Sequence, residues 1–296
     1  MNGDIQKLVN ILLNGLTQGI VIAAFALALV LIFRSTRIIN FAQGSQAMFT
    51  TYIALTLLNR DFPYWAAFAA ALAAGFLIGA LLERVVIRPL EGGMELNIVI
   101  ATLGLYVAIQ ALAAILFGSD YQSFPSPVGV NGFQVGDTNL ALTPTSIFIL
   151  CTVGVVVVGL TLLFQKTQLG LTMRAAAFDG EVSRILGVKV SHLLTFGWAL
   201  AGLVGAVAGI LVASGQFIYP SYMETLIVFG FIAAVIGGLD SPVGAVVGGV
   251  LLGLVNSLVS GYVASGLVTL AAFVLLMVVL LLKPGGLFSS AKTRRV

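Results

Sequence analysis

Long apolar stretches, separated by short polar segments, follow one another along almost the whole chain of 296 residues. A membrane-spanning helix needs about 20 mostly apolar residues, and nine stretches approach that length. They lie at 11–33, 38–58, 64–88, 96–117, 144–164, 192–214, 225–239, 243–262 and 265–282. The pattern predicts an all-α polytopic membrane protein.

The seventh stretch, 225–239, is shorter than the others and ends in Gly237-Gly238. Non-helical backbone is tolerated at membrane depth only where protein or a water-filled cavity surrounds it. This stretch is therefore either a full crossing or a broken, re-entrant element. The sequence predicts eight or nine transmembrane helices and leaves that choice open.

The composition agrees with this prediction, because 59% of the residues are hydrophobic and the mean hydropathy is +1.12, which is too apolar for a soluble domain.

Two polar segments are longer than the rest. Residues 118–143 are rich in Gly, Pro, Ser and Asn and carry no Lys or Arg, which indicates an external loop. Residues 165–191 are charged and are interpreted as a cytoplasmic loop. Nothing indicates a separate globular domain, so we predict one membrane domain over 1–296.

The positions of Lys and Arg indicate the orientation, because cytoplasmic loops carry an excess of them. If 165–191 is cytoplasmic, alternation through nine spans places 12 of the 14 Lys and Arg residues inside and leaves Lys7 and Arg60 outside. We therefore expect the N-terminus outside and the C-terminus in the cytoplasm. Since the basic residues are scattered over short loops, the net charge of +3 predicts no nucleic-acid partner.

Glycines recur at a spacing of four residues in several of the apolar stretches. The pairs are Gly15 and Gly19, Gly75 and Gly79, Gly205 and Gly209, Gly244 and Gly248, and Gly249 and Gly253. This spacing lets helix backbones approach closely. We interpret it as packing within the chain, with contact between subunits as the alternative.

Residue types that carry catalysis are scarce. His192 is the only histidine, Cys151 is the only cysteine, and no Gly-Lys dipeptide occurs, which excludes a P-loop. The acidic residues fall in loops or within about two turns of span ends. Ion-coupled carriers, in contrast, usually have acidic residues inside the membrane, or they have unwound helices that bind the ion through oxygen ligands. We expect no metal, cofactor or catalytic site in this chain, and energy supplied by another protein.

The charged segment DGEVSRILG, which begins at Asp179, predicts a short amphipathic helix on the cytoplasmic face. Asp179 is a candidate N-cap, Val182, Ile185 and Leu186 share one side, and Gly187 is a helix stop. A helix of two turns or less is marginal alone. We expect its flanking spans and a docking partner to hold it.

Within this segment, EVSRILG resembles the E-A-A-x-x-x-G cytoplasmic loop of ABC importer permeases, with Glu181 and Gly187 matching and Val182 and Ser183 in place of the alanines. Three further stretches strengthen the likeness: RIINFAQGS, GGLDSPVGAVVGGVLLGLV and LLLKPGGLF. In this order, over almost the whole chain, they resemble the permease family of branched-chain (hydrophobic) amino acid ABC importers, specifically the smaller of its two paired membrane subunits.

The resemblance implies an assembly with several partners: a second permease subunit, forming a heterodimer, two ATP-binding cassette ATPase subunits, and an extracytoplasmic substrate-binding protein. ATP and Mg²⁺ would be bound by the ATPases and not by this chain. The implied location is the bacterial cytoplasmic (inner) membrane, in contact with lipid.

The resemblance also implies roles for individual residues. The segment from Asp179 to Gly187 would be the coupling helix, seated in a groove of the ATPase. The residues assigned to coupling are Arg174, Asp179, Glu181, Arg184, Ile185, Leu186 and Gly187.

Asn40, Phe41, Gln43 and Ser45 are candidates for the translocation path. The sequence departs here from the usual family pattern of histidine, then glycine and glutamate after the alanine, because Gln43 and Ser45 stand instead. The alternative is structural: Asn40 caps a helix and Gln43 bonds a neighbouring helix. Glu224, together with Tyr219, is assigned to the outer mouth, where the binding protein docks; an interfacial aromatic anchor explains the tyrosine equally well.

The predicted function is ATP-driven import of branched-chain or other hydrophobic amino acids. Related permeases for urea, short amides or other small polar solutes are the alternative within the family. A stand-alone carrier or channel is the alternative of another class, and an intramembrane enzyme is a more distant one.

Overall fold

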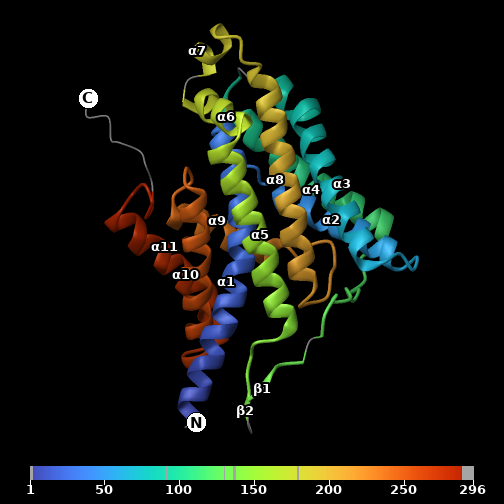
Figure 1. The fold of residues 1–296 in the computed structure, drawn as a ribbon, viewed down its shortest axis with the longest axis vertical. Coiled ribbons are helices and arrows are strands. Elements are labelled where there is room, and N and C mark those ends of the chain that lie inside the picture. The colour runs from blue at the N-terminus through green and yellow to red at the C-terminus, as the bar shows by residue number, and fades with distance from the viewer. Residues whose placement is uncertain (1–2, 91–92, 130, 136–137, 179, 289–296) are drawn as a thin grey trace. The chain divides into compact units, whose positions relative to one another are not determined.

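The structure, a computed structural model, describes residues 3–90, 93–129, 131–135, 138–178 and 180–288 (Figure 1). Its α-helices are α1 Gly3–Thr36, α2 Gln43–Leu58, α3 Tyr64–Leu82, α4 Glu95–Phe117, α5 Pro144–Lys166, α6 Gln168–Phe178, α7 Gly180–Ile185, α8 Val190–Ala213, α9 Glu224–Gly237, α10 Pro242–Tyr262 and α11 Val268–Leu282. A π-helical turn η1, Glu83–Ile87, and a 3-10 turn η2, Arg88–Leu90, continue α3, and a 3-10 turn η3, Ser265–Leu267, precedes α11. Two short antiparallel strands, β1 Gln134–Val135 and β2 Thr138–Asn139, lie between α4 and α5.

Seven helical stretches of the described residues are long and apolar enough to cross a membrane. This confirms a multi-pass, all-helical membrane protein. Two of the nine apolar stretches give shorter helices. The stretch 38–58 becomes helical only at Gln43, and α9 has 14 residues. At 1.5 Å per residue, 16 and 14 residues measure about 24 and 21 Å, less than the roughly 30 Å hydrocarbon core.

The chain divides into two compact units. Unit 1 comprises the chain up to Val30, Pro125–Val153 and the part from Val228, and unit 2 comprises Leu31–Phe124 and Gly154–Ile227. Helices α1, α5 and α9 each continue from one unit into the other. The single membrane domain over 1–296 stays a prediction.

Unit 1 is held together by glycines that bring α1 and α10 into backbone contact. A methyl group on Gly19 would lie 2.8 Å from the Cα of Val250, and one on Gly249 would meet the backbone of Ala23 at about the same distance. The Ser257 hydroxyl donates a hydrogen bond to the Ile11 carbonyl at 2.7 Å. Larger residues at these glycines would force the two helices apart.

The KPGGLF stretch near the C-terminus packs back on α9 within unit 1. Gly286 has φ +87°, and a Cβ there would lie 2.6 Å from Gly238. The Leu287 and Phe288 amides donate to the carbonyls of Ile236 and Gly237 at 2.8 and 3.0 Å, where the α9 ladder ends. These bonds satisfy helix-end carbonyls that would otherwise lack partners, which gives this motif a structural role.

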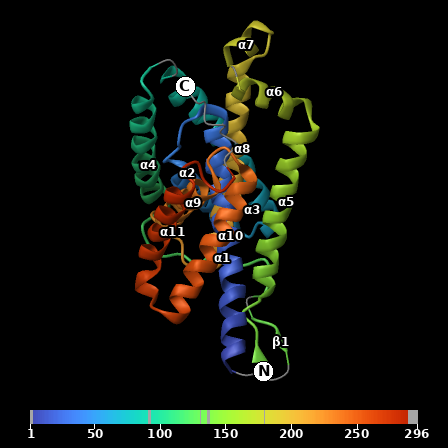
Figure 2. The same cartoon turned by 90° about the vertical axis from the view of Figure 1, so that its left-hand side faces the viewer.

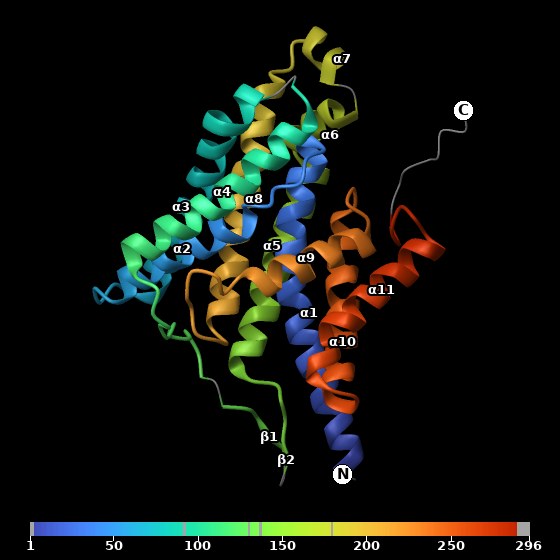
Figure 3. The ribbon, with the colours of Figure 1, turned by 180° about the vertical axis from the view of Figure 1, so that it is seen from behind.

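Unit 2 is built around α8, which packs against both α2 and α3, while α2 and α3 also contact each other (Figure 3). In the 18-residue stretch of α8 that is apolar enough to span a membrane, 83% of the residues are buried inside the protein. In the corresponding stretch of α4, only 17% are buried. Gly75 and Gly79 of α3 lie against Gly202 and the Trp198 carbonyl, and Gly209 faces Ala47 of α2. The predicted packing of closely spaced glycines within the chain is thus confirmed.

Candidate functional site

The predicted coupling segment forms a separate short helix in unit 2, beyond the first turn of α8 (Figures 1 and 2). Helix α7 follows α6, and Asp179, the predicted N-cap, lies outside the described residues. At the other end, Gly187 has φ +84°, its amide donates to Arg184 at 3.0 Å, and the Val188 amide donates to Ser183 at 2.9 Å. This left-handed glycine ends the helix as the sequence predicted.

The apolar side chains of this segment face away from the rest of the chain. Ile185 and Leu186 are 84% and 77% exposed, and Val182 is 49% exposed. Arg184 is also exposed, whereas Ser183 is buried against the flanking elements. Two large apolar side chains at the tip of a six-residue helix form a small surface that a partner can cover.

Helix α6 attaches this segment to the longer helices of unit 2. The Arg34 guanidinium lies over the Phe164 ring at 5.3 Å, and Met173 is buried near it. Arg174 is exposed, and its Nε donates to the Gly170 carbonyl of the same helix. A pocket between α1, α5, α6 and α8 is lined by Leu31, Arg34, Ser35, Phe164, Met173, Arg174, Ala176, Val190, Leu193 and Leu194. Helix α6 is therefore packed close to the end of α1 and the start of α8.

Two of the candidate translocation residues, Asn40 and Phe41, lie in the non-helical connection before α2, and the other two, Gln43 and Ser45, lie in the first turn of α2. Asn40 accepts a hydrogen bond from the Ala42 amide at 3.0 Å and donates to Gln43 Oε1 at 3.2 Å. Gln43 donates to the Ala201 carbonyl at 2.8 Å, near the middle of α8. Ser45 donates to the Ala42 carbonyl, and Phe41 is half-buried. The bond from Gln43 to α8 is that of the structural alternative, whereas the N-cap of α2 is Ala42 and not Asn40. A pathway role for the segment stays a prediction.

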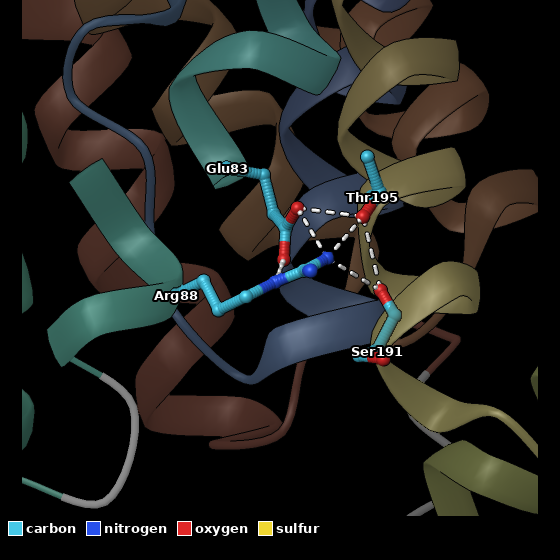
Figure 4. A network of polar contacts seen from close by, with 4 residues as sticks. All are labelled: Glu83, Arg88, Ser191 and Thr195. Atoms are coloured by element: carbon cyan, nitrogen blue, oxygen red, sulfur yellow. Dashed lines mark hydrogen bonds and ion pairs between the residues drawn. The ribbon is translucent and has the colours of Figure 1, made fainter. Parts of the chain in front are cut away.

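A polar network links the end of α3 to the start of α8 (Figure 4). The fully buried Glu83 carboxylate accepts from Arg88 Nε at 3.2 Å and from Arg88 Nη2 at 3.1 Å. It also accepts from the Thr195 hydroxyl at 2.6 Å, and Arg88 donates to the Ser191 carbonyl at 3.1 Å. The network fastens the helix that follows the coupling segment to α3.

The π-helical turn explains how Glu83 and Arg88 meet. In an α-helix, residues five apart point about 140° away from each other, because each residue turns 100°. The wider π-turn over Glu83–Ile87 reduces this divergence, and such turns are common at functional sites. Periodicity alone gave no signal for this pair.

The Glu224 carboxylate lies beside the middle of α4. Its carboxylate accepts from the Tyr106 hydroxyl at 3.1 Å and from Gln110 Nε2 at 3.5 Å. Tyr106 is eleven residues from each end of α4, so the carboxylate contacts the midpoint of a candidate span. Glu224 is the first residue of α9 and so stands at a helix end, as the sequence predicted, but its carboxylate contacts the middle of another candidate span.

Tyr219 lies near the other end of α4. Its ring contacts that of Tyr121 with centroids 4.8 Å apart, and the neighbouring Ile218 exchanges two backbone hydrogen bonds with Gln122. Tyr222, three residues on, is buried and donates to Thr51 at 2.9 Å and to the Gly209 carbonyl at 3.1 Å. The turn before α9 is thereby fixed to α2, α8 and the segment after α4.

The family of this chain follows from comparison of its sequence with known proteins. The family model described as "branched-chain amino acid transport system / permease component" matches residues 11–282. The chain belongs to this family. Among its relatives in this permease family, the high-affinity branched-chain amino acid transport system permease protein BraD of Pseudomonas aeruginosa is 29% identical, covering 96% of this chain and 97% of the relative. LivH of Escherichia coli is 28% identical, with 96% of each chain covered.

A more distant relative is the fructose import permease protein FruF of Bifidobacterium longum, 25% identical over 83% of this chain and 69% of the relative. The family resemblance that the sequence motifs predicted is therefore confirmed. The match spans both units of the permease.

Proposed function

We propose that this chain is a permease subunit of an ATP-driven importer and that its cargo is branched-chain or other hydrophobic amino acids. The full-length family match carries the proposal, and the names of BraD and LivH support this substrate class. ATP and Mg²⁺ are bound by two separate ATPase subunits. A second permease subunit and an extracytoplasmic binding protein complete the assembly, in the cytoplasmic membrane of a bacterium.

In this proposal the chain crosses the membrane nine times, with α2 and α9 as the two short elements. The N-terminus is outside and the C-terminus is cytoplasmic. The distribution of Lys and Arg supports this order, because the ends of α1, α3, α5 and α11 and the α6–α7 segment then share the cytoplasmic side.

Helix α7 is the coupling helix of this proposal. The exposed side chains of Ile185 and Leu186 enter an apolar groove of the ATPase, and Arg174 and Arg184 contact its surface, together with Glu181. A helix this short is unstable alone, so its position follows α6 and α8 on either side. When the ATPases close, α7 moves with them and shifts both helices.

The extracellular side receives the substrate in this proposal. Tyr219 belongs to the docking surface for the binding protein, next to Tyr121. Asn40, Phe41, Gln43 and Ser45 shape the wall where the short helix α2 begins. Their mutual hydrogen bonds support a positioning role in that wall.

The test is uptake of labelled leucine by vesicles that contain the whole assembly, with and without ATP. Leu186→Glu places a charge on the exposed coupling surface, and Val128→Glu makes the same change at a 37% exposed position in the segment after α4. We expect Leu186→Glu to lower ATP-driven uptake at least tenfold and to reduce recovery of the ATPase on purification, and Val128→Glu to preserve both.

Two results would contradict the proposal. Unchanged uptake and ATPase recovery with Leu186→Glu would remove the coupling role of α7. Leucine uptake by this chain without any ATPase subunit would favour the stand-alone carrier, and absence of leucine uptake by the complete wild-type assembly would exclude this substrate.

A further inference from the structure

The Glu224 carboxylate occupies an unusual depth. Tyr106, its hydrogen-bond donor, is about 16 Å from either end of α4, at 1.5 Å for each of eleven residues. Helix α4 is itself a candidate membrane span over Leu96–Phe117. The carboxylate therefore lies beside the midpoint of a candidate span, where an acidic group facing lipid would cost several kcal/mol.

This carboxylate is not enclosed by the chain. Glu224 is exposed, and its bond with Tyr106 lies at the surface. Among the described residues, no Lys, Arg or His side chain forms an ion pair with it. Since lipid is excluded on energetic grounds, the surface around Glu224 faces water or another protein.

The two carboxylate oxygens have different surroundings. Oε1 accepts both hydrogen bonds, from Tyr106 and from Gln110, and Gln110 also donates to the Tyr106 hydroxyl at 3.0 Å. No described residue donates to Oε2. One oxygen is thus held in position by two donors, and the other is open to a ligand that donates hydrogen bonds.

We propose that Glu224, positioned by Tyr106 and Gln110, binds the ammonium group of an amino acid as it passes the middle of the membrane. This inference rests on the proposed function and adds a subsite to it. An ammonium group brings both the positive charge and the N–H donors that Oε2 lacks.

The surroundings suit a hydrophobic amino acid. Leu103 and Val107 lie one helical turn apart on α4, beside the face that carries Tyr106 and Gln110, and they are 44% and 62% exposed. An apolar side chain packs against this pair while the ammonium group meets the carboxylate. Two short helices also begin near this depth: a Cβ on Gly44, in the first turn of α2, would overlap Ile227, in the first turn of α9. Short helices that start inside the membrane are typical of transporter binding sites.

The first experiment measures whether water reaches this cluster in the whole assembly. Cys151→Ala removes the only cysteine, and Gln110→Cys or Ile115→Cys is then introduced on α4. Ile115 is 80% exposed but lies away from Glu224 in an apolar part of the helix. Both variants are treated with methanethiosulfonates bearing either an ammonium or a sulfonate group, with and without ATP.

We expect Gln110→Cys to react at least tenfold faster than Ile115→Cys and to prefer the cationic reagent about tenfold. Adding Glu224→Gln to the Gln110→Cys background abolishes the preference for the cation. If Gln110→Cys reacts no faster than Ile115→Cys in either nucleotide state, the cluster is covered by a neighbouring subunit and the inference is overturned.

The second experiment compares leucine uptake kinetics at equal amounts of recovered assembly. Glu224→Gln is expected to raise the KM for leucine at least tenfold, whereas Asp120→Asn, which removes an exposed carboxylate just after α4, leaves the KM unchanged. An unchanged KM for Glu224→Gln would contradict the proposed ammonium subsite and would leave the importer proposal unaffected. If the wild-type assembly takes up no leucine, the proposed function itself fails, whatever the labelling shows.

Discussion

Replacing Arg88 by alanine removes one side of the buried pair that joins α3 to α8. The Glu83 side chain, which is 0% exposed in the wild-type structure, then loses the two N–H donors at 3.1 and 3.2 Å. Among the described residues, the Thr195 hydroxyl is the remaining donor, at 2.6 Å. A carboxylate stranded in this way has neither water nor a cation to stabilise its charge.

The expected magnitude follows from that stranded charge. Breaking a buried ion pair by removing one partner typically costs about 3–5 kcal/mol, whereas replacing both partners by apolar residues of similar volume is often neutral. We therefore expect Arg88→Ala to destabilise the protein by about 3–5 kcal/mol. The double variant Glu83→Met/Arg88→Met should cost less than about 2 kcal/mol, because the Thr195 hydroxyl retains its bond to the Ser191 carbonyl at 3.0 Å.

The assay is protease resistance of this chain within the purified assembly, measured as the surviving full-length fraction at rising temperature. Arg88→Ala should lower the midpoint clearly, and the double variant should lie close to wild type. An Arg88→Ala midpoint equal to that of wild type, or a double variant as unstable as the single one, would refute the reasoning, since the buried charge would then not be the source of the cost.

Three further outcomes are expected. Gly75→Leu should prevent close contact of α3 with α8 and sharply reduce the amount of folded chain in membranes. Gly104→Leu should not, because a Cβ at Gly104 has nothing within 4 Å. Equal amounts of folded chain for both variants would contradict this packing. Tyr222→Phe should cost about 1–3 kcal/mol, because Thr51 and the Gly209 carbonyl lose a buried partner, and a midpoint in the same protease assay equal to that of wild type would count against it. Gln43→Leu should likewise lower the midpoint, because the Ala201 carbonyl loses its hydrogen-bond donor. The uptake kinetics of Gln43→Glu then show whether a change at this position alters the KM for the substrate.

The sequence was sufficient for the class of protein, the family and the location of most helices. Spans need long apolar runs, and hydropathy records length and apolarity directly. The stop at Gly187 was also readable, because only glycine readily adopts φ +84°. The exposed side of α7 followed from the spacing of Val182, Ile185 and Leu186.

The sequence did not show which helix the Glu224 carboxylate contacts, or that Glu83 pairs with Arg88. Glu224 precedes an apolar stretch, so it resembles an interfacial residue until the 14-residue length of α9 and its contact with Tyr106 show where that helix begins. Glu83 and Arg88 are five residues apart, and only a π-turn brings them together. In both cases hydropathy along the chain carries no information about which helix lies alongside.

The sequence by itself determined which stretches are apolar enough for lipid, which ends carry positive charge and which loop carries a short amphipathic helix. These properties depend on the residue types along one segment. Only the tertiary structure decided that α8 is the core of unit 2, that Gln43 bonds the middle of that helix, and that the Glu224 carboxylate lies at the midpoint of α4. Each of these depends on contacts between helices more than 100 residues apart, where close approach of small residues and the need of buried polar groups for partners select one arrangement.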